Sequence, residues 1–136
     1  DWTGTQDISG WCALPAVMEG MADLVDGGWE GIMQHNHELA IQGRDILCDR
    51  LGIEQPCPNE MIACISTIKL PGEVLPNEKM HEPDPLHHIL SEKYNIQVPV
   101  WTWPSPAGRY LRISAQLYNS IEQYEQLADA LVNELK

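Results

Sequence analysis

Residues 97–117 read QVPVWTWPSPAGRYLRISAQL and contain two segments typical of β-strands. The first spans residues 97–103, where Pro99 favours an edge position or a bulge, because proline has no N–H to donate to a neighbouring strand. The second spans residues 110–117 and alternates apolar with polar side chains. A short turn containing proline and glycine, residues 104–108, separates them and predicts an antiparallel hairpin.

A third strand and several helices are expected around this hairpin. Residues 61–68 are rich in isoleucine and too short for a helix, which favours a buried strand. The order helix, helix, strand, helix, strand, strand, helix predicts an α+β fold, with a small, mostly antiparallel sheet and helices packed on one face. The expected helices, in which apolar residues recur at steps of three and four, are residues 12–25, 29–51, 86–94 and 121–135.

Local signals mark the ends of these helices. Ser9 is a candidate cap for the first helix, in which Pro15 is tolerated only near the first turn. Gly52 is expected to close the second helix, because glycine readily adopts the left-handed conformation found after helix ends. Ser120 and Gln123 have the spacing of a capping box for the last helix.

Composition narrows the classes of partner. A chain of 136 residues is long enough for one domain with its own core. Twenty acidic and eight basic residues give a formal charge of −12, which repels phosphate backbones and anionic lipids, so we expect neither nucleic acid nor membrane as a partner. The sequence begins with Asp rather than Met and with a turn-rich segment, which suggests a truncated chain.

The arrangement of the cysteines indicates the redox state of the cellular compartment. They show no Cys-x-x-Cys pairing and lie in segments that otherwise predict apolar helix or strand, where a free thiol packs as a small hydrophobic group. We therefore expect a reduced, cytoplasmic protein. The four are Cys12, Cys48, Cys57 and Cys64.

Two features are candidates for binding an anion. The hydroxyls of Thr3 and Thr5 flank Gly4, and such a turn can hold an anion through hydroxyl and backbone N–H groups, although most turns of this composition have no ligand. Arg112 lies in an otherwise apolar strand, where a guanidinium is costly to bury without a partner. It could bind a substrate carboxylate with both ends of its planar fork, or form an internal ion pair. The residue alone leaves both alternatives open.

Histidines do not form a recognisable metal site. His35 and His37 are two residues apart and cannot share one face of a helix. His81, His87 and His88 lie in or beside a proline-rich segment and lack the ligand spacings of zinc sites, so exposed loop polarity explains them better. A metal hydrolase built on these three residues is a remote alternative, and we expect no metal.

Taken in order, several segments resemble the class V aminotransferase-type, pyridoxal-phosphate-dependent enzymes. WTGTQD at residues 2–7 is similar to the Trp-x-Gly-Thr-x-Asp segment of the isopenicillin N epimerase branch, and residues 112–119 to its closing Arg-x-Ser-x-x-x-Tyr-Asn motif. Between these ends, residues 13–16, residues 36–37 with 39–40, and residues 98–100 are also similar to that family. The resemblance covers essentially the whole chain and is closest to that branch, with the cysteine desulfurases more distant.

This resemblance implies a fold type I enzyme that acts as a homodimer. Residues 26–136 would form its C-terminal small domain, and residues 1–25 the phosphate loop and following helix at the edge of the large domain. Gly4 and Thr5 would contact the phosphate of pyridoxal 5'-phosphate, and Arg112 would bind the α-carboxylate of an amino-acid-like substrate. Gln6 and Ile8 depart from the family, where many relatives have Arg and Pro.

The resemblance also implies that no catalytic residue lies in this chain. The lysine that carries the cofactor as a Schiff base belongs to the large domain, and none of the lysines here has the family's context around it. We therefore expect the chain alone to be inert, and the parent to catalyse epimerisation, transamination or carbon–sulfur cleavage. The alternative is a freestanding, non-catalytic binding or scaffold module with this fold. The lysines are Lys69, Lys79, Lys93 and Lys136.

Overall fold

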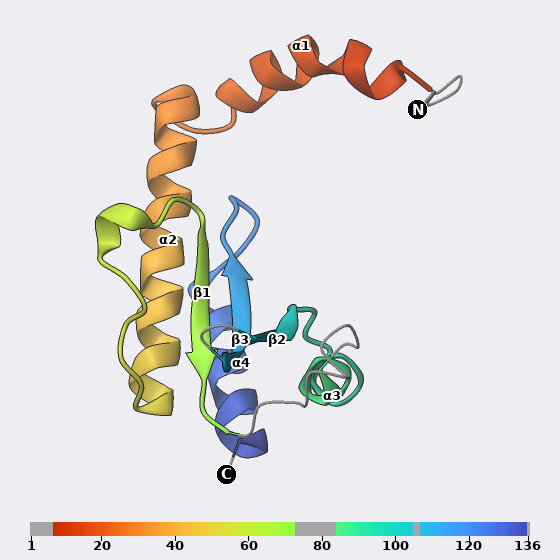
Figure 1. Cartoon of the computed structure of the whole chain (residues 1–136). Coiled ribbons are helices and arrows are strands. Elements are labelled where there is room, and N and C mark those ends of the chain that lie inside the picture. The colour runs from red at the N-terminus through yellow and green to blue at the C-terminus, as the bar shows by residue number, and fades with distance from the viewer. Residues whose placement is uncertain (1–6, 73–83, 105–106, 136) are drawn as a thin grey trace. The chain divides into compact units, whose positions relative to one another are not determined.

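The computed structural model describes residues 7–72, 84–104 and 107–135, which form helices and a three-stranded sheet (Figure 1). The chain divides into two compact units, residues 1–34 and 35–136. The division falls inside the second helix, and the domain boundary predicted after residue 25 stays a prediction. The elements are α1 Ser9–Ala22, α2 Gly28–Leu51, the 3-10 helix η1 Asn59–Met61, β1 Ile65–Leu70, α3 Pro85–Tyr94, β2 Val100–Pro104, β3 Ala107–Ser114 and α4 Ile121–Glu134.

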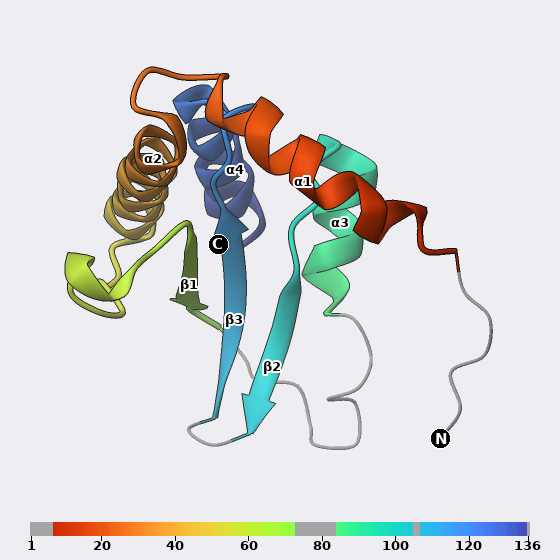
Figure 2. The same ribbon diagram turned by 90° about the horizontal axis from the view of Figure 1, so that it is seen from above.

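The sheet is antiparallel throughout, in the order β1-β3-β2 (Figure 2). In its register Thr67 lies opposite Arg112, and Val100 lies opposite Leu111. The α+β fold and the predicted hairpin are confirmed. β2 is an edge strand, as Pro99 predicted, because a residue without an N–H is tolerated where no second neighbour needs a hydrogen bond.

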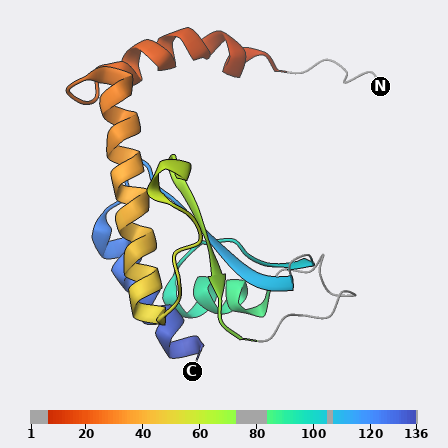
Figure 3. The same cartoon turned by 60° about the vertical axis from the view of Figure 1, so that its left-hand side comes forward.

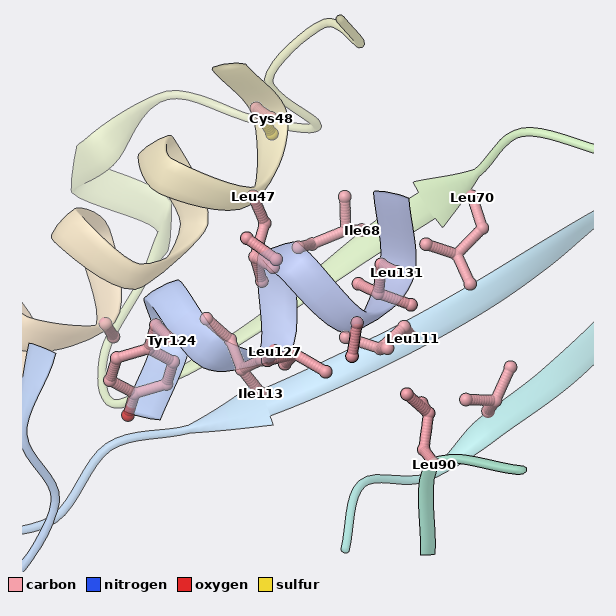
Figure 4. Close-up of a cluster of buried hydrophobic side chains, with 14 of the residues drawn as sticks. Leu47, Cys48, Ile68, Leu70, Leu90, Leu111, Ile113, Tyr124, Leu127 and Leu131 are labelled. Atoms are coloured by element: carbon pink, nitrogen blue, oxygen red, sulfur yellow. The ribbon is translucent and has the colours of Figure 1, made fainter. Parts of the chain in front are cut away.

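The core of the second unit lies between this sheet and the helices on one of its faces. Leu47 of α2, Ile68 of β1, Leu111 of β3, and Leu127 and Leu131 of α4 are all buried in one cluster (Figure 4). Buried and exposed residues alternate along β1 and β3, as expected for a sheet covered on one side.

Two helices of this unit touch at a glycine. α2 and α4 lie side by side (Figure 3), and a Cβ added at Gly43 would come within 2.9 Å of ring carbons of Tyr124. The aromatic ring therefore rests on the α2 backbone itself. A larger residue at this position would push the two helices or the ring apart.

The helix ends of the second unit use side-chain and glycine signals. Asp84 caps α3 and accepts the Leu86 N–H at 2.8 Å. The predicted capping box of α4 is confirmed, with the Gln123 amide oxygen accepting the Ser120 N–H at 3.2 Å. Gly52 follows α2 with φ of 64°, as predicted for a helix-terminating glycine.

α1 differs from its prediction at its start. Ile8 occupies the cap position without a side-chain hydrogen bond, so the expectation that Ser9 caps this helix is wrong. Ser9 is instead the first helical residue, and both its N–H and its hydroxyl donate to Asp7, at 2.9 and 3.0 Å. Pro15 consequently lies inside the helix rather than in its first turn. No residue of α1 is buried.

Several strand boundaries also differ. β2 begins at Val100 rather than at residue 97, and β3 begins at Ala107 rather than at residue 110, within the predicted turn. Residues 59–61 form η1 with Met61 exposed, so the strand predicted to begin at residue 61 begins at Ile65. β3 ends at Ser114 rather than at residue 117. The reason is a turn in which Asn119 bonds to Gln116 through backbone and side chain, which local alternation of apolar residues does not reveal.

The described part of the chain has no helix long and apolar enough to span a membrane. All four cysteines are free. Cys48 packs in the core as expected, and burial raises the pKa of its thiol. Cys12 is exposed, so the expectation that each thiol packs as a small hydrophobic group is wrong there.

Candidate functional site

Two arginines of β3 have opposite environments. Arg109 forms an ion pair with Asp84, whose side chain is only 1% exposed. Its Nε donates to Oδ2 at 2.7 Å and its Nη2 donates to Oδ1. Because Asp84 also caps α3, this pair ties β3 to the start of that helix. The sequence analysis did not single out Arg109; the acid that pairs with it lies 25 residues away.

Arg112 is exposed on the other face of the same strand. Its backbone N–H donates to Pro99 O at 3.2 Å, which continues the pairing with the segment before β2. Among the described residues its guanidinium forms no ion pair. The internal ion pair that was one alternative for Arg112 is not seen among the described residues; Arg109 forms such a pair instead. The guanidinium of Arg112 is therefore available to a ligand.

Arg112 lines a surface pocket of about 370 Å³ at the end of β3. The pocket is bounded by the segment before β2, the turn after β3 and the start of α4. Among the described residues Arg112 is the single charged group that lines it, and amides and hydroxyls supply the other polar groups. A guanidinium with no described carboxylate beside it favours an anionic ligand locally. The other lining residues are Asn95, Ile96, Gln97, Val98, Pro99, Ile113, Ser114, Tyr118, Asn119, Gln123, Tyr124, Gln126 and Leu127.

The wall of this pocket after β3 is held by side-chain amides. The Asn119 Oδ1 accepts the Gln116 N–H at 3.0 Å, and its Nδ2 donates to Gln123 Oε1 at 2.9 Å. Asn36 of α2 donates to Gln116 Oε1 at 3.1 Å. Asn36 and Asn119, which both lie in segments that resemble the enzyme family, thus shape the turn after β3. Tyr118, in the same turn, lines the pocket and is 82% exposed.

Tyr124 joins the pocket to the core. Its ring is buried, and its hydroxyl donates to Ser114 O at 2.8 Å. Burial raises the pKa of this phenol, and the nearby Tyr118 raises it further. The hydroxyl therefore stays protonated at neutral pH and acts as a hydrogen-bond donor.

Arg44 is a buried arginine of α2 that the sequence did not bring out as a structural residue. It is fully buried in α2 and bonds to Asp45 Oδ1 at 2.7 Å and to Asn59 Oδ1 at 2.6 Å. It also donates to Cys57 O at 3.2 Å, so it holds the segment after α2 against the helix. Its position four residues after the buried Ala40 was the available signal, because that spacing places both on one face.

Lys93 does not suit cofactor attachment. The Lys93 amine donates to Glu134 Oε1 at 2.7 Å, and its hydrogen bonds with Glu134 and then with Tyr94 raise the pKa of the amine. A more strongly protonated amine is a poorer nucleophile. Lys69 lies in β1. Gly4, Thr5, Lys79 and Lys136 lie outside the described residues.

The histidines make local contacts. His37 Nδ1 lies 2.8 Å from Ile62 O, and His87 Nδ1 lies 2.7 Å from Val98 O. Within residues 7–72, 84–104 and 107–135, no three histidine, cysteine or acidic side chains are grouped as metal ligands. His81 lies outside these residues.

Comparison with known proteins found no matching family model, but it found enzymes similar to nearly the whole chain. The chain is 32% identical over 136 residues to a probable chloroplastic L-cysteine desulfhydrase of Arabidopsis thaliana, covering 96% of the chain and 28% of that protein. It is 32% identical to another L-cysteine desulfhydrase of that plant, covering 99% of the chain and 32% of the relative. It is 33% identical to isopenicillin N epimerase of Streptomyces clavuligerus, covering 94% and 30%.

These homologues are class V aminotransferase-type pyridoxal-phosphate enzymes, so the resemblance noted in the sequence is confirmed. The chain spans about three tenths of the length of the relatives it matches. The similarity therefore concerns one part of a longer enzyme.

Proposed function

We propose that this chain, whose homologues are class V aminotransferase-type pyridoxal-phosphate enzymes, is the C-terminal domain of such an enzyme, and that Arg112 binds the carboxylate of an amino acid or amino-acid derivative. The observation that carries this role is the exposed guanidinium in a pocket that, in the part of the chain the structure describes, no acidic side chain lines. A carboxylate matches the planar donors of arginine in shape and charge. Neutral amide and hydroxyl groups around it can bind the rest of the substrate.

The cofactor would be held mainly by the part of the enzyme outside this chain. When bound, pyridoxal phosphate supplies the electron sink that makes bonds at the α-carbon of an amino acid reactive. Lys93, engaged with Glu134, does not fit a role as the attachment lysine. Gly4 and Thr5 are proposed to contact the cofactor phosphate, and Arg112 to orient the substrate through its carboxylate.

Residues 1–25 are proposed to pack at the edge of the larger domain, and residues 26–136 to form the small domain. The exposure of α1 supports this arrangement, because an apolar helix with no buried residue requires a covering surface. A homodimer in the cytoplasm completes the proposal, although one relative is named chloroplastic.

The substrate and reaction belong to the same proposal. Relatives named cysteine desulfhydrases make carbon–sulfur cleavage of cysteine the first activity to assay, followed by epimerisation and transamination. The chain alone should be inert. Treating this chain with pyridoxal phosphate and then borohydride should modify no particular lysine. The same treatment of the full-length protein should modify one lysine, which lies outside this chain.

Arg112→Ala in the full-length enzyme tests the carboxylate role. Loss of a bidentate charged contact should lower kcat/KM about a hundredfold, mainly through KM, and Arg112→Lys should restore part of it. Arg50→Ala is the matched control, because it removes a surface cation that pairs with Asp129 away from the pocket. An unchanged kcat/KM for Arg112→Ala would refute the proposal.

A further inference from the structure

Tyr124 connects its own helix, α4, with two other elements beside the Arg112 pocket, α2 and β3. It belongs to α4, and its ring is 5% exposed. One side of the ring rests on Gly43 of α2, where an added Cβ would lie 2.9 Å from ring carbons. At the other end, the hydroxyl donates to Ser114 O at 2.8 Å. The side chain thus links α2 and α4 to the last residue of β3.

Ser114 lies two residues after Arg112, on the same face of β3. Among the described residues, no ion pair holds the guanidinium of Arg112, so its position depends on the backbone of the strand. That backbone is bonded on one side through Arg112 N–H to Pro99 O, at 3.2 Å. The hydrogen bond from Tyr124 to Ser114 O reaches the strand backbone two residues from Arg112.

We propose that Tyr124 is a positioning residue for Arg112. Its hydrogen bond holds the end of β3, and the contact with Gly43 holds the ring, so the guanidinium meets the substrate carboxylate in one orientation. This inference rests on the proposed function of Arg112. Tyr124 itself acts through the protein backbone rather than on the reacting atoms.

The environment of the phenol agrees with this role. Burial raises its pKa, so the hydroxyl remains a neutral donor rather than a base. Its hydrogen is directed to Ser114 O. A group in this state can stabilise a strand end, but it is poorly suited to remove a proton at neutral pH.

Tyr124→Phe in the full-length enzyme removes this hydrogen bond and keeps the ring. With cysteine or whichever amino acid proves to be the substrate, we expect KM to rise about three- to tenfold, the effect of one lost hydrogen bond. We expect kcat to change by less than about twofold. Tyr94→Phe is the matched control, because it loses a hydrogen bond to Glu134 at 2.6 Å but does not line the pocket.

A double-mutant cycle separates positioning from a general effect on folding. If Tyr124 acts through Arg112, Tyr124→Phe should not raise KM further once Arg112 is alanine. An equal rise in both backgrounds, or none in the wild type, would overturn the positioning role. If Arg112→Ala leaves KM unchanged, the carboxylate role fails as well, so the two failures are distinguishable.

Gly43→Ala approaches the same contact from α2. The added methyl should displace the Tyr124 ring, since it would lie 2.9 Å from ring carbons. We expect a rise in KM that is not additive with Tyr124→Phe. Additive rises would contradict a shared route through Ser114.

Discussion

α1 and α4 have the same length, 14 residues, and opposite relations to the core. α4 begins with a capping box and buries one face, including Tyr124, Leu127 and Leu131. α1 has no side-chain cap, contains Pro15 and buries no residue. α4 is therefore stabilised by contacts within this chain, whereas the described residues cover no side chain of α1 completely.

The difference shows that apolar content and apolar pattern have separate consequences. In α4, polar residues on one side and apolar residues on the other match a single covering surface. In α1, Glu19 is the single charged residue, and large apolar groups such as Trp11 and Met18 are exposed. A short helix containing proline is marginal in water, so α1 is expected to need a surface that covers its apolar groups.

The largest expected effect is on the free energy of unfolding and comes from a core residue of α4. Leu131→Ala in α4 should lower the free energy of unfolding by about 2–5 kcal/mol, because a fully buried leucine leaves a cavity. Leu14→Ala in α1, where the side chain is 45% exposed, should cost about 0.5 kcal/mol or less. Urea unfolding of this chain measures both. Comparable losses would show that α1 is packed as well as α4.

A charged substitution in α1 tests whether this helix is covered in the full-length enzyme. Met18→Glu should leave this chain as stable as before, because the side chain is 57% exposed. In the full-length enzyme the same change should cost about 2 kcal/mol or more if α1 is covered there, since an unpaired carboxylate would be buried. Met61→Glu, at a side chain 75% exposed in η1, is the control. Thermal unfolding should show equal effects of the two variants only if α1 remains exposed.

The smallest expected effect is at the end of α4. The hydrogen bond between Lys93 and Glu134 raises the pKa of the amine and lowers that of the carboxyl. The contribution of Glu134 is present above its ordinary value of 4.5 and is lost as pH falls; that of Lys93 is present below 10.5 and is lost as pH rises. The Lys93 side chain is 63% exposed, so solvent screens the pair and its contribution should be small.

Glu134→Gln should therefore reduce stability slightly at neutral pH and converge with the wild type at acidic and strongly alkaline pH. Lys93→Met should show the same behaviour, because either change removes the pair. Thermal unfolding across this pH range provides the measurement. A constant difference at every pH would mean that the pair does not contribute through its charges.

Much of the fold could be predicted because its signals are local. Apolar spacing predicted the order of helices and strands, and Ser120 with Gln123 predicted the start of α4. Pro99 predicted an edge strand. The prediction that Ser9 caps α1 was wrong because Ile8 occupies the cap position. Ser9 is the first helical residue, and its N–H donates to Asp7.

The candidate site was less predictable, because its chemistry depends on residues far apart in the chain. Arg112 was identified, but the pocket formed around it by the segment before β2 and by α4 was not. Arg44 was missed, since its partners lie in the segment that folds back after α2. Gly4 and Thr5 keep their proposed phosphate role as a prediction, outside the described residues.

The sequence by itself determined the element order, the helix ends of α2 and α4, and the resemblance to its homologues, because these follow from neighbouring residues and motifs. Only the tertiary structure decided which arginine of β3 would be paired. Arg109 pairs with Asp84, the capping residue of α3, while Arg112, on the opposite face, lines a pocket without a described acidic side chain. Strand alternation separates the two faces, but the acid is supplied by folding, which brings residues 25 positions apart into contact.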